Sequence, residues 1–195
     1  MTAISPLQSI HKKGIFGDHH QKNESDLLNI AELKNLSIIQ IVKYKNSKIQ
    51  LNEIQVDGLK LGLQSSKVSS NNNTRVIWNA PNTLLILSKK ENIIKSINEN
   101  CDNENFAVTD ISHSRAIIQI KGAQAKEVLK KGCPINFNEL KKNYCAGSVF
   151  HGITMLVDCV DDEIQIYNLF ALRSFGESLH HHITDASLEF GYLGI

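Results

Sequence analysis

The sequence lacks the features that define several large classes of protein. Its four cysteines, Cys101, Cys133, Cys145 and Cys159, are widely spaced, so they form neither a CxxC metal knuckle nor a disulfide framework. We expect reduced, partly buried thiols. The longest apolar runs are short, such as residues 38–42, whereas a membrane-spanning helix needs about 18 apolar residues. These absences predict a soluble protein that folds without covalent staples.

The sequence also lacks an excess of charge of either sign. The 195 residues include 21 Lys plus Arg and 20 Asp plus Glu, a formal net charge of +1. No net field therefore favours a nucleic acid or an anionic membrane. Residues 1–18 contain no unbroken apolar segment ahead of a small-residue cleavage site, so we predict no secretory signal and a cytoplasmic location.

Glycine-rich phosphate loops are missing as well. Gly58, Gly62, Gly122 and Gly132 form neither GxGxxG nor GxxxxGK[ST]. We therefore expect no dinucleotide or ATP site in this chain.

The first 35 residues have only weak apolar periodicity, which predicts an N-terminal arm. A short helix is expected near residues 25–33, where Leu27, Ile30 and Ala31 give a partial apolar face, and an extended segment is the alternative. Because such an arm buries little of itself, it is a candidate interface. We expect residues 1–24 to be mobile in isolation and ordered against a partner.

Regular patterns begin after the arm. Residues 36–44 are rich in β-branched side chains and predict a strand. Residues 64–74 are polar and predict an exposed, mobile loop. Residues 75–78 and 82–87 predict a hairpin with a proline-containing turn, and residues 89–100 predict a helix with one isoleucine-rich face.

A similar order follows in the second half. Residues 115–121 predict a strand, and residues 122–132 predict a helix that ends at Gly132 in a left-handed cap. The remaining expected elements are strands at 148–157 and 163–170 and an amphipathic helix at 173–189.

The two halves resemble each other. The string IIQI opens both, at residues 38–41 and 117–120, and a patterned helix closes both. This order predicts a duplicated α+β fold with halves of about 36–105 and 106–195, packed as one pseudo-symmetric, cooperative domain. The alternative is that α+β chains often alternate such elements, and that β-branched runs share four letters easily.

Two histidine clusters invite a metal assignment. In His180, His181 and His182, successive side chains on a helix point about 100° apart and do not converge on one ion. We expect a polar flank, with His182 at the edge of the apolar face and His181 pointing away. His19 and His20 lie in the predicted arm without an acidic or thiolate neighbour, so a surface position is expected.

Residues 108–115, VTDISHSR, form the densest cluster of functional side chains. A nucleophile with its base is conceivable, but sequence-adjacent groups rarely reach the angles that a catalytic triad requires. We instead expect a turn in which Asp110 and Ser112 bond to nearby groups while His113 and Arg115 make structural contacts.

This cluster opens a longer stretch with a family resemblance. Residues 108–137 resemble the middle signature of sarcosine oxidase γ subunits, in which a DxSHxR turn leads to a strand, a GxxAxxxL helix and a GCPI ending. Residues 173–191 are similar to the closing helix of that family, and residues 5–7 to its start. Residues 78–87 resemble its WxGPDEWLL strand pair.

The chain departs from that pattern at a few positions. Ala80 replaces a glycine, Thr83 an acid and Leu84 a tryptophan, and Asn136 stands where an aspartate is expected. The resemblance is close over about residues 110–190 and looser elsewhere.

The resemblance implies a fold related to the folate-binding, aminomethyltransferase-like proteins. It further implies a heterotetrameric enzyme that oxidises sarcosine to glycine, reduces oxygen to hydrogen peroxide and passes the one-carbon unit to tetrahydrofolate. The partners implied are the α, β and δ subunits. FAD, FMN, NAD and the folate site would belong to α and β, and zinc to δ.

We therefore predict a non-catalytic γ subunit that supports assembly, with no catalytic, cofactor-binding or metal-binding residue of its own. Two alternatives stay open. One is a stand-alone folate-binding protein of the related fold, and the other is an accessory subunit of an oxidase for a related N-methyl amino acid.

Overall fold

A computed structural model describes residues 4–195. The chain divides into two compact units. Unit 1 combines residues 4–34 with residues 113–195, and unit 2 is the continuous segment 35–112. The sequence patterns predicted a different division, with an arm over residues 1–35 followed by halves that meet near residue 105. The structure differs because the N-terminal segment pairs with strands from the far end of the chain.

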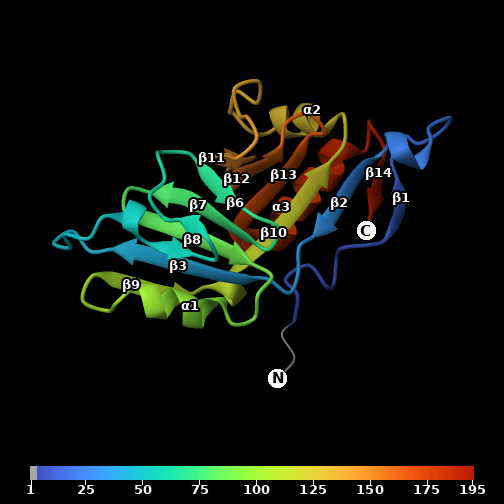
Figure 1. The fold of residues 1–195 in the computed structure, drawn as a ribbon. Helices are drawn as coiled ribbons and strands as arrows, with labels where there is room; N and C mark the ends of the chain where they lie inside the picture. Colours follow the sequence, from blue (N-terminus) through green and yellow to red (C-terminus); the bar gives the residue numbers. More distant parts are fainter. Residues whose placement is uncertain (1–3) are drawn as a thin grey trace. The chain divides into compact units, whose positions relative to one another are not determined.

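Unit 1 is built on a seven-stranded sheet in the order β1-β14-β2-β10-β13-β12-β11 (Figure 1). All neighbouring strands are antiparallel except β14 and β2, which are parallel. The strands are β1 (Gly14–Phe16), β2 (Leu28–Glu32), β10 (Arg115–Lys121), β11 (Tyr144–Phe150), β12 (Ile153–Asp161), β13 (Ile166–Leu172) and β14 (Tyr192–Gly194).

Two helices complete this unit, α2 (Ala125–Lys130) and α3 (Gly176–Ser187). They pack on each other, and α3 also packs on β10 and β13. Leu179 and Ile183, one helical turn apart, are fully buried and give α3 its core-facing stripe. The helices expected at 122–132 and 173–189 are therefore confirmed, with a 3-10 turn, Arg173–Phe175, preceding α3.

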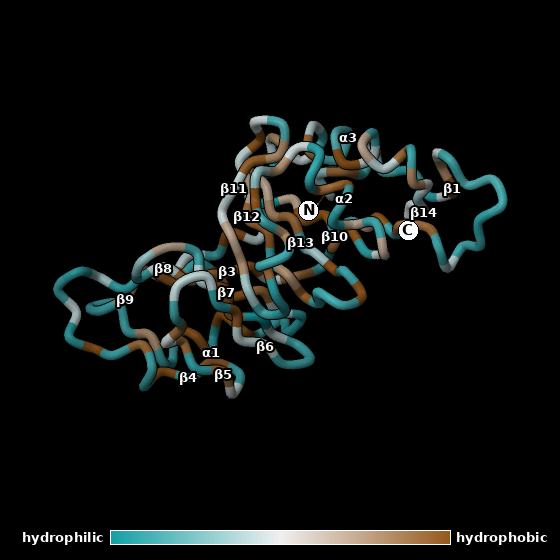
Figure 2. The backbone as a smooth tube through the Cα atoms, turned by 90° about the horizontal axis from the view of Figure 1, so that it is seen from above, coloured by the Kyte–Doolittle hydropathy of each residue, from teal (hydrophilic) through white to brown (hydrophobic). Residues whose placement is uncertain are grey.

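The N-terminal segment is part of the core of unit 1. Leu7, Leu28 and Ile30 are at most 1% exposed, and β2 lies between β14 and β10. These contacts differ from the predicted arm, because residues far apart in sequence supply the apolar surface that the segment cannot bury by itself. The loop between β1 and β2 is hydrophilic (Figure 2, teal). Residues 1–3, at the tip of the predicted arm, lie outside the described residues.

The helix predicted at residues 25–33 was wrong. A single 3-10 turn, Glu24–Asp26, leads directly into strand β2. Apolar residues at 27, 30 and 31 fit a helix, while 28 and 30 fit a strand. Pairing of β2 with β10 in the register Ile30↔Ile120 decides in favour of the extended alternative.

Unit 2 contains a five-stranded antiparallel sheet in the order β6-β7-β8-β3-β9 and a small β4-β5 ribbon. Helix α1 (Ile93–Asn100) contacts β4 and β9. The strands are β3 (Ser37–Lys43), β4 (Gln55–Val56), β5 (Leu59–Lys60), β6 (Val68–Ser70), β7 (Thr74–Ala80), β8 (Thr83–Ser88) and β9 (Phe106–Asp110). The strand expected at 36–44, the hairpin and the helix within 89–100 are confirmed.

Three smaller expectations were wrong. The strand expected at 148–157 is two strands, β11 and β12, joined by a tight turn at His151 and Gly152, where both residues have positive φ. The predicted mobile loop 64–74 contains strand β6. Gly132 does not adopt the left-handed conformation expected of a helix cap.

A glycine contact fastens the two distant pieces of unit 1 together. Gly191 has φ +70°, and a Cβ there would lie 2.4 Å from the carbonyl oxygen of Asp18. Asp18 N–H donates to the carbonyl of Leu188 at 2.7 Å. Only glycine permits both this backbone conformation and this approach of the two chain segments.

The observed elements confirm an α+β fold, with strands outnumbering helices. Both IIQI strings lie in interior strands, in β3 between β8 and β9 and in β10 between β2 and β13. The internal duplication itself stays a prediction.

Candidate functional site

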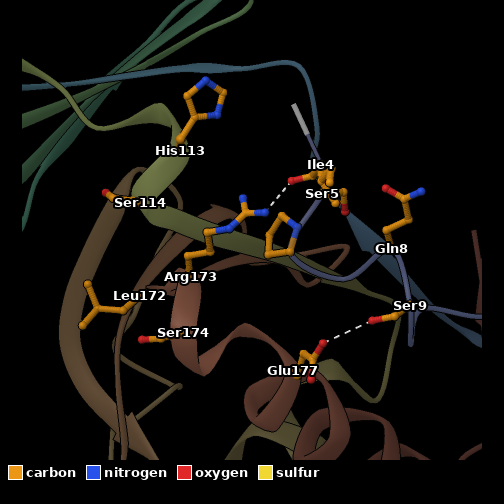
Figure 3. Close-up of a pocket in the computed structure, with 11 residues that line it drawn as sticks. Ile4, Ser5, Gln8, Ser9, His113, Ser114, Leu172, Arg173, Ser174 and Glu177 are labelled. Atoms are coloured by element: carbon orange, nitrogen blue, oxygen red, sulfur yellow. Dashed lines mark hydrogen bonds between the residues drawn. The ribbon is translucent and has the colours of Figure 1, made fainter. Parts of the chain in front are cut away.

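An open cavity lies in unit 1 where residues 4–9 pass the beginning of α3 (Figure 3). Its volume is about 1010 Å³. Three parts of the chain contribute walls: the N-terminal segment, the entry to β10, and the turn from β13 into α3. The lining residues are Ile4, Ser5, Pro6, Gln8, Ser9, His113, Ser114, Leu172, Arg173, Ser174 and Glu177.

The floor of this cavity is closely packed. A Cβ at Gly176 would lie 2.8 Å from Cβ of Ala116, so the first turn of α3 lies directly on β10. Leu7 is fully buried in the same core. Two polar contacts hold the N-terminal wall: Arg173 Nη2 donates to the carbonyl of Ile4, and Ser9 Oγ donates to Glu177 Oε1 at 3.2 Å.

One arginine lines the cavity, and a second is bonded to a lining serine. Arg173 belongs to the lining, and Arg115 donates from Nη1 to Ser114 Oγ at 3.2 Å and to Ser114 O at 3.3 Å. Burial lowers the pKa of Arg115 from its ordinary value. Leu172, the residue before Arg173, pairs with Arg115 across the β10–β13 ladder, so both arginines lie at the same end of these strands.

The rim of the cavity is apolar and exposed. Ile4 is 68% exposed and Leu172 47%, and both line the cavity. Phe175, which shares the 3-10 turn with Arg173, is 48% exposed. Large apolar side chains gathered around a polar opening are typical of a binding surface.

A histidine pair joins the N-terminal segment to α3. His180, on α3, is 6% exposed, and its Nε2 lies 3.0 Å from Nδ1 of His11. Nε2 of His11 lies 2.7 Å from the carbonyl oxygen of Ile195, which can only accept, so His11 Nε2 donates there. Burial, and then the charge of His11, lowers the pKa of His180 to about 4.

A smaller cavity of about 420 Å³ adjoins this pair. It is lined by Ile10, Lys12, Phe16, Glu177, His180, His181, Thr184 and Tyr192. Because His180 is held neutral and bonded to His11, its Nε2 is occupied by an interaction that fastens the N-terminal segment to α3.

The histidine triplet otherwise matches its prediction. His181 is exposed, and His182 is half-buried against His151, with ring centroids 5.0 Å apart. The burial of His180 was not foreseen. Within residues 4–195, no three or more His, Cys, Asp and Glu side chains are grouped so that they could hold a metal ion. His19 and His20 are exposed and stacked on each other.

The 108–115 cluster forms the expected turn. Asp110 Oδ1 accepts from the amide of Ser112 at 2.9 Å and from its hydroxyl at 2.5 Å. Ser112 Oγ in turn accepts from the amide of Ile38 at 2.9 Å. The carboxylate and the hydroxyl thus fasten the turn to the beginning of β3, and His113 is exposed in the cavity wall.

The four thiols are free and buried, as expected. Burial raises the pKa of Cys101 to about 11 and that of Cys159 to about 12, with nearby carboxylates acting in the same direction. Such thiols are poor nucleophiles because the thiolate is the reactive form.

Comparison with known families decides the chain's relationship. The model of the sarcosine oxidase, gamma subunit family matches residues 49–189. The chain belongs to this family. The sarcosine oxidase γ family resemblance seen in the DxSHxR turn and the GCPI ending is thereby confirmed.

Solved structures give the fold of this γ-family chain. It matches a chain of the heterotetrameric sarcosine oxidase from Corynebacterium sp. U-96, in complex with pyrrole 2-carboxylate, with a TM-score of 0.79 at 18% identity. The match covers 96% of this chain and 95% of that chain. At such identity the likeness shows a shared fold.

A second match is the glycine cleavage system aminomethyltransferase T from Bartonella henselae, with a TM-score of 0.61 at 12% identity. It covers 82% of this chain and 46% of that chain, and it confirms the aminomethyltransferase-like fold. Among curated proteins, no significant sequence match was found. No helix within residues 4–195 of this γ-family chain is long and apolar enough to cross a membrane.

Sequence reasoning missed the cavity of the γ-family chain altogether. Its walls come from residues near 5, 114 and 173, which only the fold brings together. One feature of the sequence bears on this cavity. Arg173 and Phe175 lie at the start of the segment that resembles the family's closing helix, and Phe175 is exposed although it is a large apolar residue.

Proposed function

We propose that this chain is the γ subunit of a heterotetrameric sarcosine oxidase and supports assembly without contributing residues to the chemistry. The observation that carries the proposal is the family match over residues 49–189. The fold likeness to a chain of such an enzyme, over 95% of that chain, supports it.

The contacts made by the polar clusters around Asp110 and His180 support the non-catalytic part of the proposal. Asp110 and Ser112 bond to each other and to β3, and His180 bonds to His11. Both sets of contacts join segments of the fold, which is the work of structural residues. A catalytic base, by contrast, is aimed at a place where substrate can bind.

In this proposal the partners are the α, β and δ subunits in the cytoplasm. FAD, FMN, NAD and tetrahydrofolate are held by α and β, and zinc by δ. The complex converts sarcosine to glycine and hydrogen peroxide and passes the one-carbon unit to tetrahydrofolate. The substrate pocket lies on another chain, so a related N-methyl amino acid is an alternative substrate of the same assembly.

Co-expression with the α, β and δ chains from the same source tests this proposal. We expect all four chains to co-elute in equal amounts and the complex to oxidise sarcosine. Omitting the γ chain should reduce recovery of the intact complex. The isolated γ chain should be colourless and inactive; a yellow preparation that oxidises sarcosine by itself would contradict the accessory role.

The likeness to aminomethyltransferase T favours one second candidate, a stand-alone folate-binding protein. Titration of the isolated chain with tetrahydrofolate separates the two. Micromolar binding to the chain alone, together with no assembly with the other subunits, would favour this candidate.

A further inference from the structure

We infer that the open cavity beside α3 is a docking site for an acidic, apolar-flanked segment of a partner subunit. This inference rests on the proposed function, because it assigns the surface by which the chain joins its complex. It replaces the predicted flexible arm with a preformed site, one wall of which is the N-terminal segment.

The first argument is unmatched positive charge. The guanidinium of Arg173 donates to the carbonyl of Ile4, and that of Arg115 donates to Ser114. Within the described residues 4–195, neither guanidinium forms an ion pair with a carboxylate. Arg115 is partly buried, and a desolvated cation without a counter-charge is costly unless something pairs with it. Arg173 lines the cavity itself, and the guanidinium of arginine matches the geometry of a carboxylate fork.

The second argument is the distribution of charge along the cavity. Glu177 is the carboxylate in its lining, and it is engaged by Ser9. Figure 3 shows Glu177 and Ser9 at one end, while His113 and Ser114 lie at the other. The cavity therefore has a basic end that suits a carboxylate, and the orientation of the bound segment would be fixed by this polarity.

The third argument is the apolar rim. Ile4 and Leu172 line the cavity and are exposed. Phe175, in the same 3-10 turn as Arg173, is exposed as well. Protein interfaces concentrate exposed apolar and aromatic side chains around arginine. Pockets for small ligands enclose most of the ligand's surface, whereas this cavity is open to solvent, which favours an extended chain segment.

A photo-crosslink in the assembled complex tests the occupant directly. Ser174, an exposed cavity residue, is replaced by the photoreactive residue benzoylphenylalanine in the full chain co-expressed with its partners. We expect an adduct that maps to one partner segment containing Asp, Glu or a terminal carboxylate beside apolar residues. An intact complex without such an adduct, or with a bound small anion shown by native mass spectrometry, would overturn the inference.

Charge reversal supplies the second measurement. Arg173→Glu should weaken assembly of the complex by about tenfold or more, in a salt-dependent way, and Arg173→Lys should restore part of it. Lys121→Glu, an exposed charge reversal at the other end of β10, is the matched control and should change assembly less than twofold. If Arg173→Glu also lowers the melting temperature of the isolated chain, its weaker assembly could come from lost stability. The Ser174 crosslink then decides whether a partner segment occupies the cavity.

The outcomes separate this inference from the proposed function. If the wild-type chain joins no complex, both fall. If it joins a complex whose assembly tolerates Arg173→Glu and whose cavity yields no partner adduct, the γ-subunit role stands and the docking site does not.

Discussion

The two units of the molecule differ in how their strands are gathered. Unit 2 is one continuous segment. Its strand β8 pairs with β7 and with β3, and in both pairs the partner residues are less than 80 positions apart in the sequence. In unit 1, β2 pairs with β10 across about 90 positions and with β14 across more than 160. Closing such long loops costs entropy that only a large shared core offsets.

The polar content of the two cores differs as well. The unit 2 network lies at a sheet edge, where Thr74 Oγ1 donates to Asp57 Oδ2 at 2.6 Å and Lys90 pairs with the same carboxylate. The Lys90 and Thr74 bonds lower the pKa of Asp57. In unit 1 the fully buried Asp158 accepts from Asn168 at 3.2 Å. Buried polar groups thus occur in both units, with Thr74 and Ser88 in unit 2 and Asp158 and Asn168 in unit 1.

The largest effect should come from matched core deletions. Ile30→Ala in unit 1 and Ile39→Ala in unit 2 each remove a fully buried side chain, with an expected loss of about 3–4 kcal/mol. Amide hydrogen exchange should show the first variant opening β2 and β10 and the second opening β3 and β8. Equal loss of protection in both units for each variant would instead support the single cooperative domain expected from sequence.

Gly191→Ala should be next in size. A side chain there meets a left-handed φ of +70° and the Asp18 carbonyl at 2.4 Å, so about 2–4 kcal/mol of unfolding free energy should be lost. The control is Gly147→Ala, because nothing lies within 4 Å of a Cβ at Gly147 and its φ is not positive. Denaturant titrations compare the two variants. Similar losses of unfolding free energy would show that the close contact between Gly191 and Asp18 adds no stability of its own.

The buried His180 should make unit 1 acid-sensitive. Its pKa is about 4 in the folded state against 6.5 as the ordinary value, so the unfolded chain binds the extra proton between these values. Stability is therefore complete above about pH 6.5 and falls as pH drops towards 4, by roughly 3 kcal/mol at most.

His11 and His181 oppose protonation of His180, while Glu32 favours it. Denaturation midpoints measured from pH 7 to pH 4 should flatten in His180→Gln. The same substitution at exposed His20 should leave the pH profile unchanged. An unaltered profile in His180→Gln would show that other groups control the acid response.

The smallest effect belongs to the turn at the end of unit 2. Ser112→Ala removes the acceptor for the Ile38 amide and one donor to Asp110, with an expected cost of about 1–2 kcal/mol. Ser25→Ala, which removes only an exposed contact with Asp26, should cost less than about 0.5 kcal/mol. Chemical denaturation of both variants checks the difference.

Predictions from local pattern succeeded where the deciding contacts are local. The β-branched run of β3, the hairpin from Thr74 to Ser88, and the isoleucine stripe of α1 all specify their structure within a few residues. The Asp110–Ser112 turn was also predictable, because short polar side chains bond to neighbouring amides. The γ-family motif at residues 108–137 includes this turn and continues through β10 and α2.

Predictions failed where partners are distant. Residues 25–33 allowed both helix and strand, and pairing with β10 selected the strand. The cavity and the burial of His180 followed from the same event, since the N-terminal segment supplies both His11 and the wall at Ile4.

The sequence by itself determined the α+β class, most of the strands and helices, and membership of the sarcosine oxidase γ family, because hydrophobic period and motif spacing are written in neighbouring residues. Only the tertiary structure decided that the N-terminal segment is a core element, that His180 is buried, and that Arg173 faces an open cavity. These features depend on contacts between residues more than 100 positions apart, which no local pattern encodes.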